Sequence, residues 1–172
     1  MYQTAEHAVE SSLRLLALPI APTSATAVVI DALRRHFDDT YLEHESSGYT
    51  KHDWHANAVM VIKQAERALG AHSLEWDAIV SRYGDNSTGG WHLAVNRLAS
   101  HVGTGLDHRV TMRLIQNVQQ GRPSLREIEA EYVVAHSTLH RRSRSVSEEL
   151  RRLERVGFDV LDTVLRDAGS LS

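Results

Sequence analysis

The stretch SLREIEAEYVVAHSTLHRRSRS, residues 124–145, predicts two short helices joined by a three-residue turn. Ser124 and Glu127 have the spacing of a capping box, so we expect a helix to begin at the next residue, Leu125. The break VVA ends that helix, and a second helix is expected to start around residue 136. The apolar positions that frame this break are typical of a helix-turn-helix, in which two helices cross and a valine fills the corner: Ile128, Tyr132, Val134 and Leu139.

The second of these helices is expected to carry a DNA-binding surface. Its first turn offers hydroxyl and imidazole groups, which suit base edges or phosphates, and its second turn offers arginines, which suit phosphate or guanine. Its N-terminus is expected to attract a phosphate through unpaired N–H groups. The predicted DNA-contacting residues are His136, Ser137, Thr138, His140, Arg141, Arg142 and Arg144, with Arg151, Arg152 and Arg155 steering the DNA electrostatically.

The first helix of the pair is acidic and does not fit a DNA-facing surface. Its glutamates, Glu127, Glu129 and Glu131, are therefore expected to face solvent or a protein partner. Three other interpretations of the arginines stay open: a solvated helix face, an RNA-binding surface, or a surface for an acidic protein.

The positive charge of the chain is local. The formal net charge is −3, and residues 1–120 hold ten basic and thirteen acidic side chains, whereas residues 136–155 hold six arginines and three glutamates. This distribution disfavours a protein that coats nucleic acid over its whole surface and favours one specific contact region.

Helical spacing of apolar residues predicts an all-α fold along the whole chain. We expect a helical N-terminal part over 1–70 and a helix-turn-helix part over 74–168. The expected helices of the first part are 4–18, a segment after Thr23 or Ser24 that reaches residue 41, and 54–69, capped by Asp53 and stopped by Gly70. Short helices ended by glycines follow.

One long helix is expected from about residue 136 to 168, with a kink at Gly157. A helix of this length spans roughly 45–50 Å, more than a small domain needs to close its core. Its apolar seam could pack on the N-terminal helices or on a second copy of the chain, as in a coiled-coil-like homodimer.

Several classes of protein and site are disfavoured by the residues present. The chain has no cysteine, so thiolate chemistry, disulfides and Cys-ligated metals are excluded. The apolar run LRLLALPIA is about half the length of a membrane span and follows acidic residues, so we expect a cytoplasmic protein without a membrane partner.

Metal, cofactor and catalytic sites are not expected. Histidines and acids crowd residues 36–55 without zinc-site spacing, so we interpret them as surface residues: His36, Asp38, Asp39, His44, His52, Asp53 and His55. The loop GDNSTGG at 84–90 lacks the GK[ST] ending of a phosphate-binding loop, and no GxSxG elbow occurs. Trp54, Trp76 and Trp91 are expected in the core, with Trp91 the candidate for a partner contact.

Residues 124–142 resemble SLREIAxxYGVSHSTLHRR, the helix-turn-helix of region-4-like and phage regulatory proteins. Val133 stands where the turn of that pattern has glycine, Glu129 where its first helix has alanine, and Ala135 where a capping serine is usual. A β-branched residue would be strained in a left-handed turn, so either the turn differs or the motif is degenerate.

The broader layout, including RYG at 82–84, resembles phage late-gene regulators and Q-type antiterminators. That resemblance implies binding to a promoter-proximal element of double-stranded DNA and docking on RNA polymerase in a bacterial host cell. Two other functions stay open: a phage DNA-packaging recognition subunit, similar to a small terminase, and a protein-binding helical adaptor.

Overall fold

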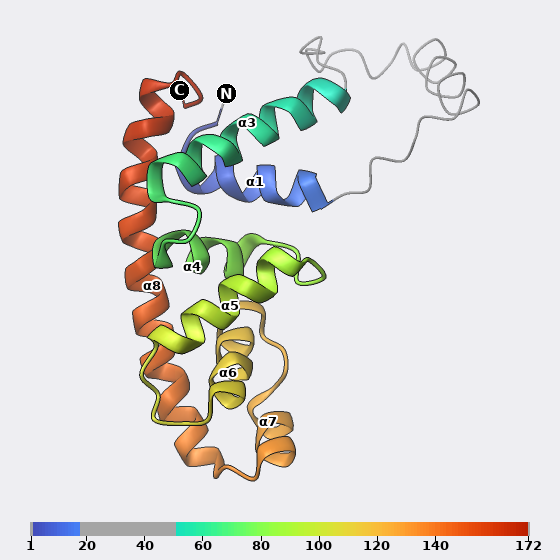
Figure 1. The fold of residues 1–172 in the computed structure, drawn as a ribbon, viewed down its shortest axis with the longest axis vertical. Coiled ribbons are helices and arrows are strands. Elements are labelled where there is room, and N and C mark those ends of the chain that lie inside the picture. Colours follow the sequence, from blue (N-terminus) through green and yellow to red (C-terminus); the bar gives the residue numbers. More distant parts are fainter. Residues whose placement is uncertain (1, 18–50, 172) are drawn as a thin grey trace, which may run out of the picture.

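The computed structural model describes residues 2–17 and 51–171, which form seven helices (Figure 1). The all-α fold and the long C-terminal helix predicted from the sequence are confirmed. Within the described residues, extended pairing is limited to an isolated bridge between Tyr2 and Leu171. The helices are α1 (Ala5–Ala17), α3 (Lys51–Leu69), α4 (Leu74–Tyr83), α5 (Gly89–His101), α6 (His108–Gln120), α7 (Leu125–Tyr132) and α8 (His136–Asp167).

Helix α8 is the axis of the molecule. It has 32 residues and is about 48 Å long, and α1, α3, α4, α6 and α7 all pack on it. Figure 1 shows α1 and α3 side by side at its C-terminal end, α4 and α5 beside its middle, and α6 and α7 at its N-terminal end. The apolar face of α8 therefore packs on helices of the same chain. These helices come both from residues 1–70 and from residues 74–168.

Helix α8 runs as one helix through Gly157, the position of the predicted kink. Gly157 is buried against α4, and a Cβ atom there would lie 3.0 Å from Ile79 Cδ1 and 3.3 Å from Glu75 Cβ. The missing side chain lets the two helices approach closely. Gly157 therefore has a role in packing.

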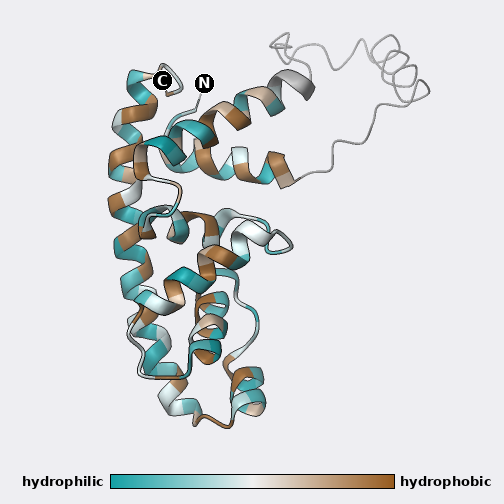
Figure 2. Cartoon of the chain, viewed as in Figure 1, coloured by the Kyte–Doolittle hydropathy of each residue, from teal (hydrophilic) through white to brown (hydrophobic). Residues whose placement is uncertain are grey.

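Three apolar clusters follow one another along α8. Hydrophobic and hydrophilic residues alternate along the helix (Figure 2), as expected for an element with one buried face. Leu161 and Leu165 pack with α1, α3 and α4, and Leu150 and Leu153 pack with α4, α5 and α6. Leu139 packs with α6 and α7 in the third cluster.

Helix ends predicted from capping residues are mostly found where expected. Ser73 caps α4 by accepting a hydrogen bond from the Trp76 N–H, and Gly70 follows α3 with a φ of 90°. Helix α3 begins earlier than predicted, at Lys51, so Asp53 lies inside the helix and is not its cap. The helix predicted after residue 23 and the His/Asp residues 36–44 lie outside the described residues.

Two of the three tryptophans lie in the core, as expected. Trp91 was the candidate for a partner contact, but it is only 2% exposed and donates from Nε1 to the Ser81 carbonyl at 3.0 Å. Trp76 is buried as expected, whereas Trp54 is 44% exposed. Among the described helices, none has the length and apolar character that crossing a membrane requires.

Candidate nucleic-acid interface

Residues 124–139 form a helix-turn-helix with the predicted boundaries. Helix α7 ends at Tyr132 and α8 begins at His136. The capping box is present: the Ser124 N–H donates to Glu127 Oε2 at 2.6 Å, and the Glu127 N–H donates to Ser124 Oγ at 3.3 Å. The hydrogen bond from the Ser124 backbone is the main reason that the pKa of Glu127 lies below its ordinary value.

A third helix, α6, completes this unit. Ile128 of α7 and Leu139 of α8 are fully buried against Val110 and Leu114 of α6. The corner residue Val134 is partly buried on the same cluster, as predicted. The predicted motif comprised only α7 and α8, although the amphipathic run 108–120 after the N-cap Asp107 is a sequence signal for the third helix.

The turn keeps left-handed geometry although it lacks glycine. Val133 has φ 55° and ψ 41°, and it is the one non-glycine residue with positive φ in the part of the chain that the structure describes. Its side chain is 92% exposed, so packing does not compensate for the conformation. The turn therefore has the left-handed conformation of the resembled pattern. Val133 adopts this conformation in place of glycine and is strained by it.

The N-terminus of α8 is capped from α7. Ala135 provides no side-chain hydrogen bond, and Glu129 Oε1 accepts instead from the His136 N–H at 3.2 Å. Two departures from the resembled pattern are thus linked, because the glutamate in place of alanine accepts from a first-turn N–H of a helix that lacks a capping serine.

This arrangement corrects two expectations. Glu129 was expected to face solvent or a partner, but it is half-buried and reaches the head of α8. The α8 N-terminus was expected to offer unpaired N–H groups to a phosphate, but the His136 N–H already has a partner, and the Thr138 N–H donates to the Ala135 carbonyl at 2.9 Å. The other two acids of α7 are exposed: Glu127 closes the capping box and Glu131 lies 3.5 Å from Arg113.

Exposed arginines follow one face of α8. Steps of three and four residues keep side chains on one side of a helix, and this spacing connects Ser137, Arg141, Arg144, Glu148, Arg151 and Arg155, all of which are exposed. Leu139, Val146 and Leu150 occupy the opposite, buried face. We name Arg141, Arg144, Arg151 and Arg155 the arginine stripe.

The remaining predicted contact residues lie beside this stripe. His136 and His140 are exposed, whereas Thr138 and Arg142 are half-buried on the flank of α8. Arg142 lies against the α5–α6 loop at Gly105, and its buried Nε has no hydrogen-bond partner. The flank position makes Arg142 less available to a ligand than the arginine stripe.

Arg152 is exposed but already has an acidic partner. Its Nε and Nη2 donate to Glu149 at 3.0 and 2.6 Å. Glu149 also lies 3.5 Å from His101 Nε2 of α5. The hydrogen bond from Arg152 is the main cause that lowers the pKa of Glu149, so the charge of Arg152 is partly neutralised within the protein.

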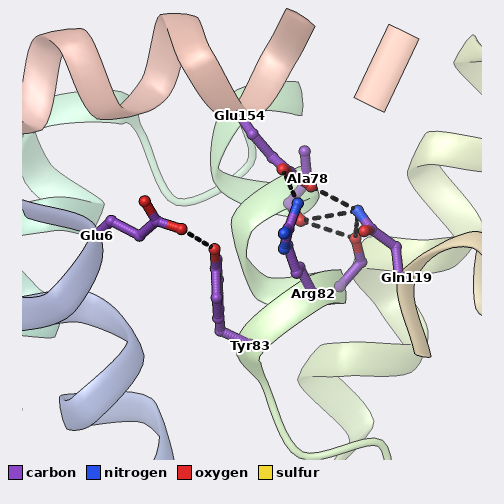
Figure 3. Close-up of polar contacts among 7 residues, drawn as sticks. Glu6, Ala78, Arg82, Tyr83, Gln119 and Glu154 are labelled. Atoms are coloured by element: carbon purple, nitrogen blue, oxygen red, sulfur yellow. Dashed lines mark hydrogen bonds and ion pairs between the residues drawn. The ribbon is translucent and has the colours of Figure 1, made fainter. Parts of the chain in front are cut away.

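A buried polar cluster joins the three-helix unit to the rest of the fold (Figure 3). Glu154 of α8 is only 6% exposed. It accepts hydrogen bonds from Arg82 Nη1 of α4 at 2.7 Å and from Gln119 Nε2 of α6 at 2.9 Å. The same amide lies 3.2 Å from Ser81 Oγ. These bonds connect α4 and α6 to α8 beside the apolar cluster that the three helices share.

This polar cluster around Glu154 was not predicted from the sequence. Its signal is that Glu154 has the same helical spacing as the buried Leu150 and Gly157, so a carboxylate at this position requires buried partners. A polar pocket of about 160 Å³ lies beside the cluster, and its lining includes Arg82, Gln119 and Arg151 of the arginine stripe.

A larger hollow, of about 370 Å³, lies between α1, α3, α4 and α5. Its lining is mainly apolar and includes Leu13, Ile62 and Leu93. Asp77 at its wall has a side chain only 1% exposed, and Arg97 Nε donates to it at 2.7 Å. This carboxylate therefore already has a charged partner. Among the side chains that the structure describes, in residues 2–17 and 54–171, no three or more acidic or histidine groups converge as metal ligands would.

Comparison with protein-family models and with curated proteins finds no match for the chain. The functional interpretation therefore depends on the chemistry and geometry of the helix-turn-helix and of the arginine stripe.

Proposed function

We propose that the protein is a sequence-specific DNA-binding transcription regulator. The observation that carries this proposal is the arginine stripe, which leaves four guanidinium groups exposed on the second helix of a well-packed helix-turn-helix. Guanidinium groups bind phosphates and guanine edges with paired hydrogen bonds, so a duplex is the ligand that this surface fits best.

In the proposed complex, the N-terminal turns of α8 enter the major groove, which is about as wide as a helix with its side chains. Arg141 and Arg144 then reach base edges, together with Ser137 and His140. Arg141 and Arg155 are separated by about 21 Å along the helix axis, so the distal arginines of the stripe meet phosphates beside the groove. Thr138, Arg142 and Arg152 contribute less, because they lie on the flank or pair with Glu149.

The proposal extends to transcription through the resemblance of residues 124–142 to phage regulatory proteins. In this account the protein is a phage-type antiterminator or late-gene activator that acts with RNA polymerase in the cytoplasm of a bacterial host. Figure 1 shows α1 and α3 at the end of α8 opposite α7. A polymerase could bind that end while the helix-turn-helix holds DNA.

The test begins with selection of preferred sequences from random duplexes, followed by binding titrations at several salt concentrations. Arg141→Ala combined with Arg144→Ala should abolish specific binding and leave the helix content unchanged. The matched control is Arg67→Ala combined with Arg166→Ala, which removes two exposed arginines at the other end of the molecule. The control should retain specific binding, because its arginines lie outside the stripe.

The salt dependence and the oligomeric state separate the remaining functions. The slope of log affinity against log salt should be about −0.9 for each phosphate contacted. Wild-type binding by the Arg141/Arg144 variant would overturn the proposal, and no affinity for any duplex would favour the protein-binding adaptor. A large ring in light scattering would favour the packaging subunit, whereas increased read-through of a terminator in vitro would support the regulator.

A further inference from the structure

The acidic cap at the head of α8 has a consequence for binding to DNA. The Glu129 carboxylate accepts from the first N–H of α8, that of His136, at 3.2 Å. His136 and Ser137 beside it are exposed and directly precede the arginine stripe. A negative charge therefore lies where the proposed recognition helix would first meet a duplex.

A helix N-terminus attracts anions, because its unpaired N–H groups and the helix dipole both favour negative charge. On a DNA-binding helix the available anion is a backbone phosphate. Glu129 already takes this place with a carboxylate from the same chain. A phosphate that approached this helix end would find the His136 N–H already bonded to Glu129. It would also be repelled by the negative charge of the Glu129 carboxylate.

We propose that Glu129 is a specificity-determining residue that keeps backbone phosphates away from the head of α8. This inference rests on the proposed DNA-binding function. Contacts to phosphates supply the sequence-independent part of the affinity, whereas contacts to base edges supply discrimination. A complex that places the head of α8 on a phosphate is disfavoured by Glu129, and a complex that places it over base edges in the groove is not.

The magnitude follows from the release of counterions. One phosphate contact changes the slope of log affinity against log salt by about 0.9, which is about an eightfold gain in affinity for each tenfold dilution of salt. Removal of the Glu129 charge should therefore steepen the salt dependence for arbitrary duplexes by up to this amount.

The decisive variant is Glu129→Gln, because an amide oxygen can still accept from the His136 N–H while the charge is gone. Titration of a random-sequence duplex should show tighter binding and a steeper salt slope than the wild type. Affinity for the selected site should rise less, so the ratio of specific to non-specific affinity falls. A second variant, Glu129→Ala with Ala135→Ser, replaces the cap by a neutral hydroxyl and should behave in the same way.

Glu10→Gln is the charge-matched control, because Glu10 lies on α1 at the opposite end of the molecule and should leave the slope unchanged. Equal slopes for wild type and both Glu129 variants, or weaker binding by these variants, would overturn the inference while leaving the proposed function intact. If the wild type and all variants fail to bind any duplex, the proposed function itself is wrong.

Discussion

Replacement of Val133 by glycine should stabilise the protein, although it removes a side chain. Val133 holds φ 55° in the turn between α7 and α8, and the left-handed conformation costs an L-residue roughly 1–2 kcal/mol. Its side chain is 92% exposed, so its removal forfeits almost no buried apolar area. The added freedom of glycine in the unfolded chain offsets about 0.4–1 kcal/mol of this gain.

The net expectation for Val133→Gly is a gain of about 0.5–1 kcal/mol, which raises Tm by roughly 1–4 °C for a chain of this size. Val133→Asn should gain a similar amount or more, because asparagine tolerates the left-handed region without the entropy cost of glycine. Thermal unfolding followed by circular dichroism measures both variants.

The matched control is Val134→Gly, one residue further along the chain. Val134 is half-buried on the cluster that contains Ile128 and Leu139, so this change should lower Tm. A lower Tm for both Val133 variants would contradict the reasoning, because it would mean that the turn is not strained at this residue.

Three further changes test the buried ion pair, the core of the helix-turn-helix and the capping box. Asp77→Ala should lower the free energy of unfolding by about 2–4 kcal/mol in urea titration, since it leaves Arg97 without its buried partner. Leu139→Ala should cost about 2–4 kcal/mol and weaken DNA binding, because this fully buried residue joins α8 to α6 and α7. The Ser124 N–H holds the pKa of Glu127 below its ordinary value of 4.5, so the box stabilises the fold above about pH 4.5 and loses this contribution as the pH falls through the depressed pKa. Glu127→Gln should therefore flatten the acid limb of a stability–pH profile.

An exposed ion pair and an exposed α8 residue provide the controls for these changes. Glu10→Ala breaks an exposed pair with Arg14 and should cost less than about 1 kcal/mol, in contrast to Asp77→Ala. His140→Ala changes the exposed neighbour of Leu139 and should leave stability unchanged. Equal losses for the two ion pairs, or for the two α8 variants, would show that burial does not control their contributions. Identical acid profiles for the parent and the Glu127 variant would contradict the assignment of the capping box.

The local features of this protein could be predicted from the sequence. The ends of α7, the corner at Val134 and the helical stop at Gly70 depend on residues within a few positions of each other, and all are found as predicted. The exposure of Arg141 and Arg144 could also be predicted, because helical spacing places them opposite Leu139.

The features that depend on distant residues were decided only by the tertiary structure. Glu154 has its partners inside the fold only because Arg82 and Gln119, distant in the chain, converge on it, and the buried indole of Trp91 finds its acceptor in the Ser81 carbonyl of another helix. Glu129 caps α8 only because the turn brings the end of α7 against the head of the next helix. Helical periodicity indicates which residues share a face, but the partner of each face is set by how helices pack, and packing depends on side chains far apart in the sequence.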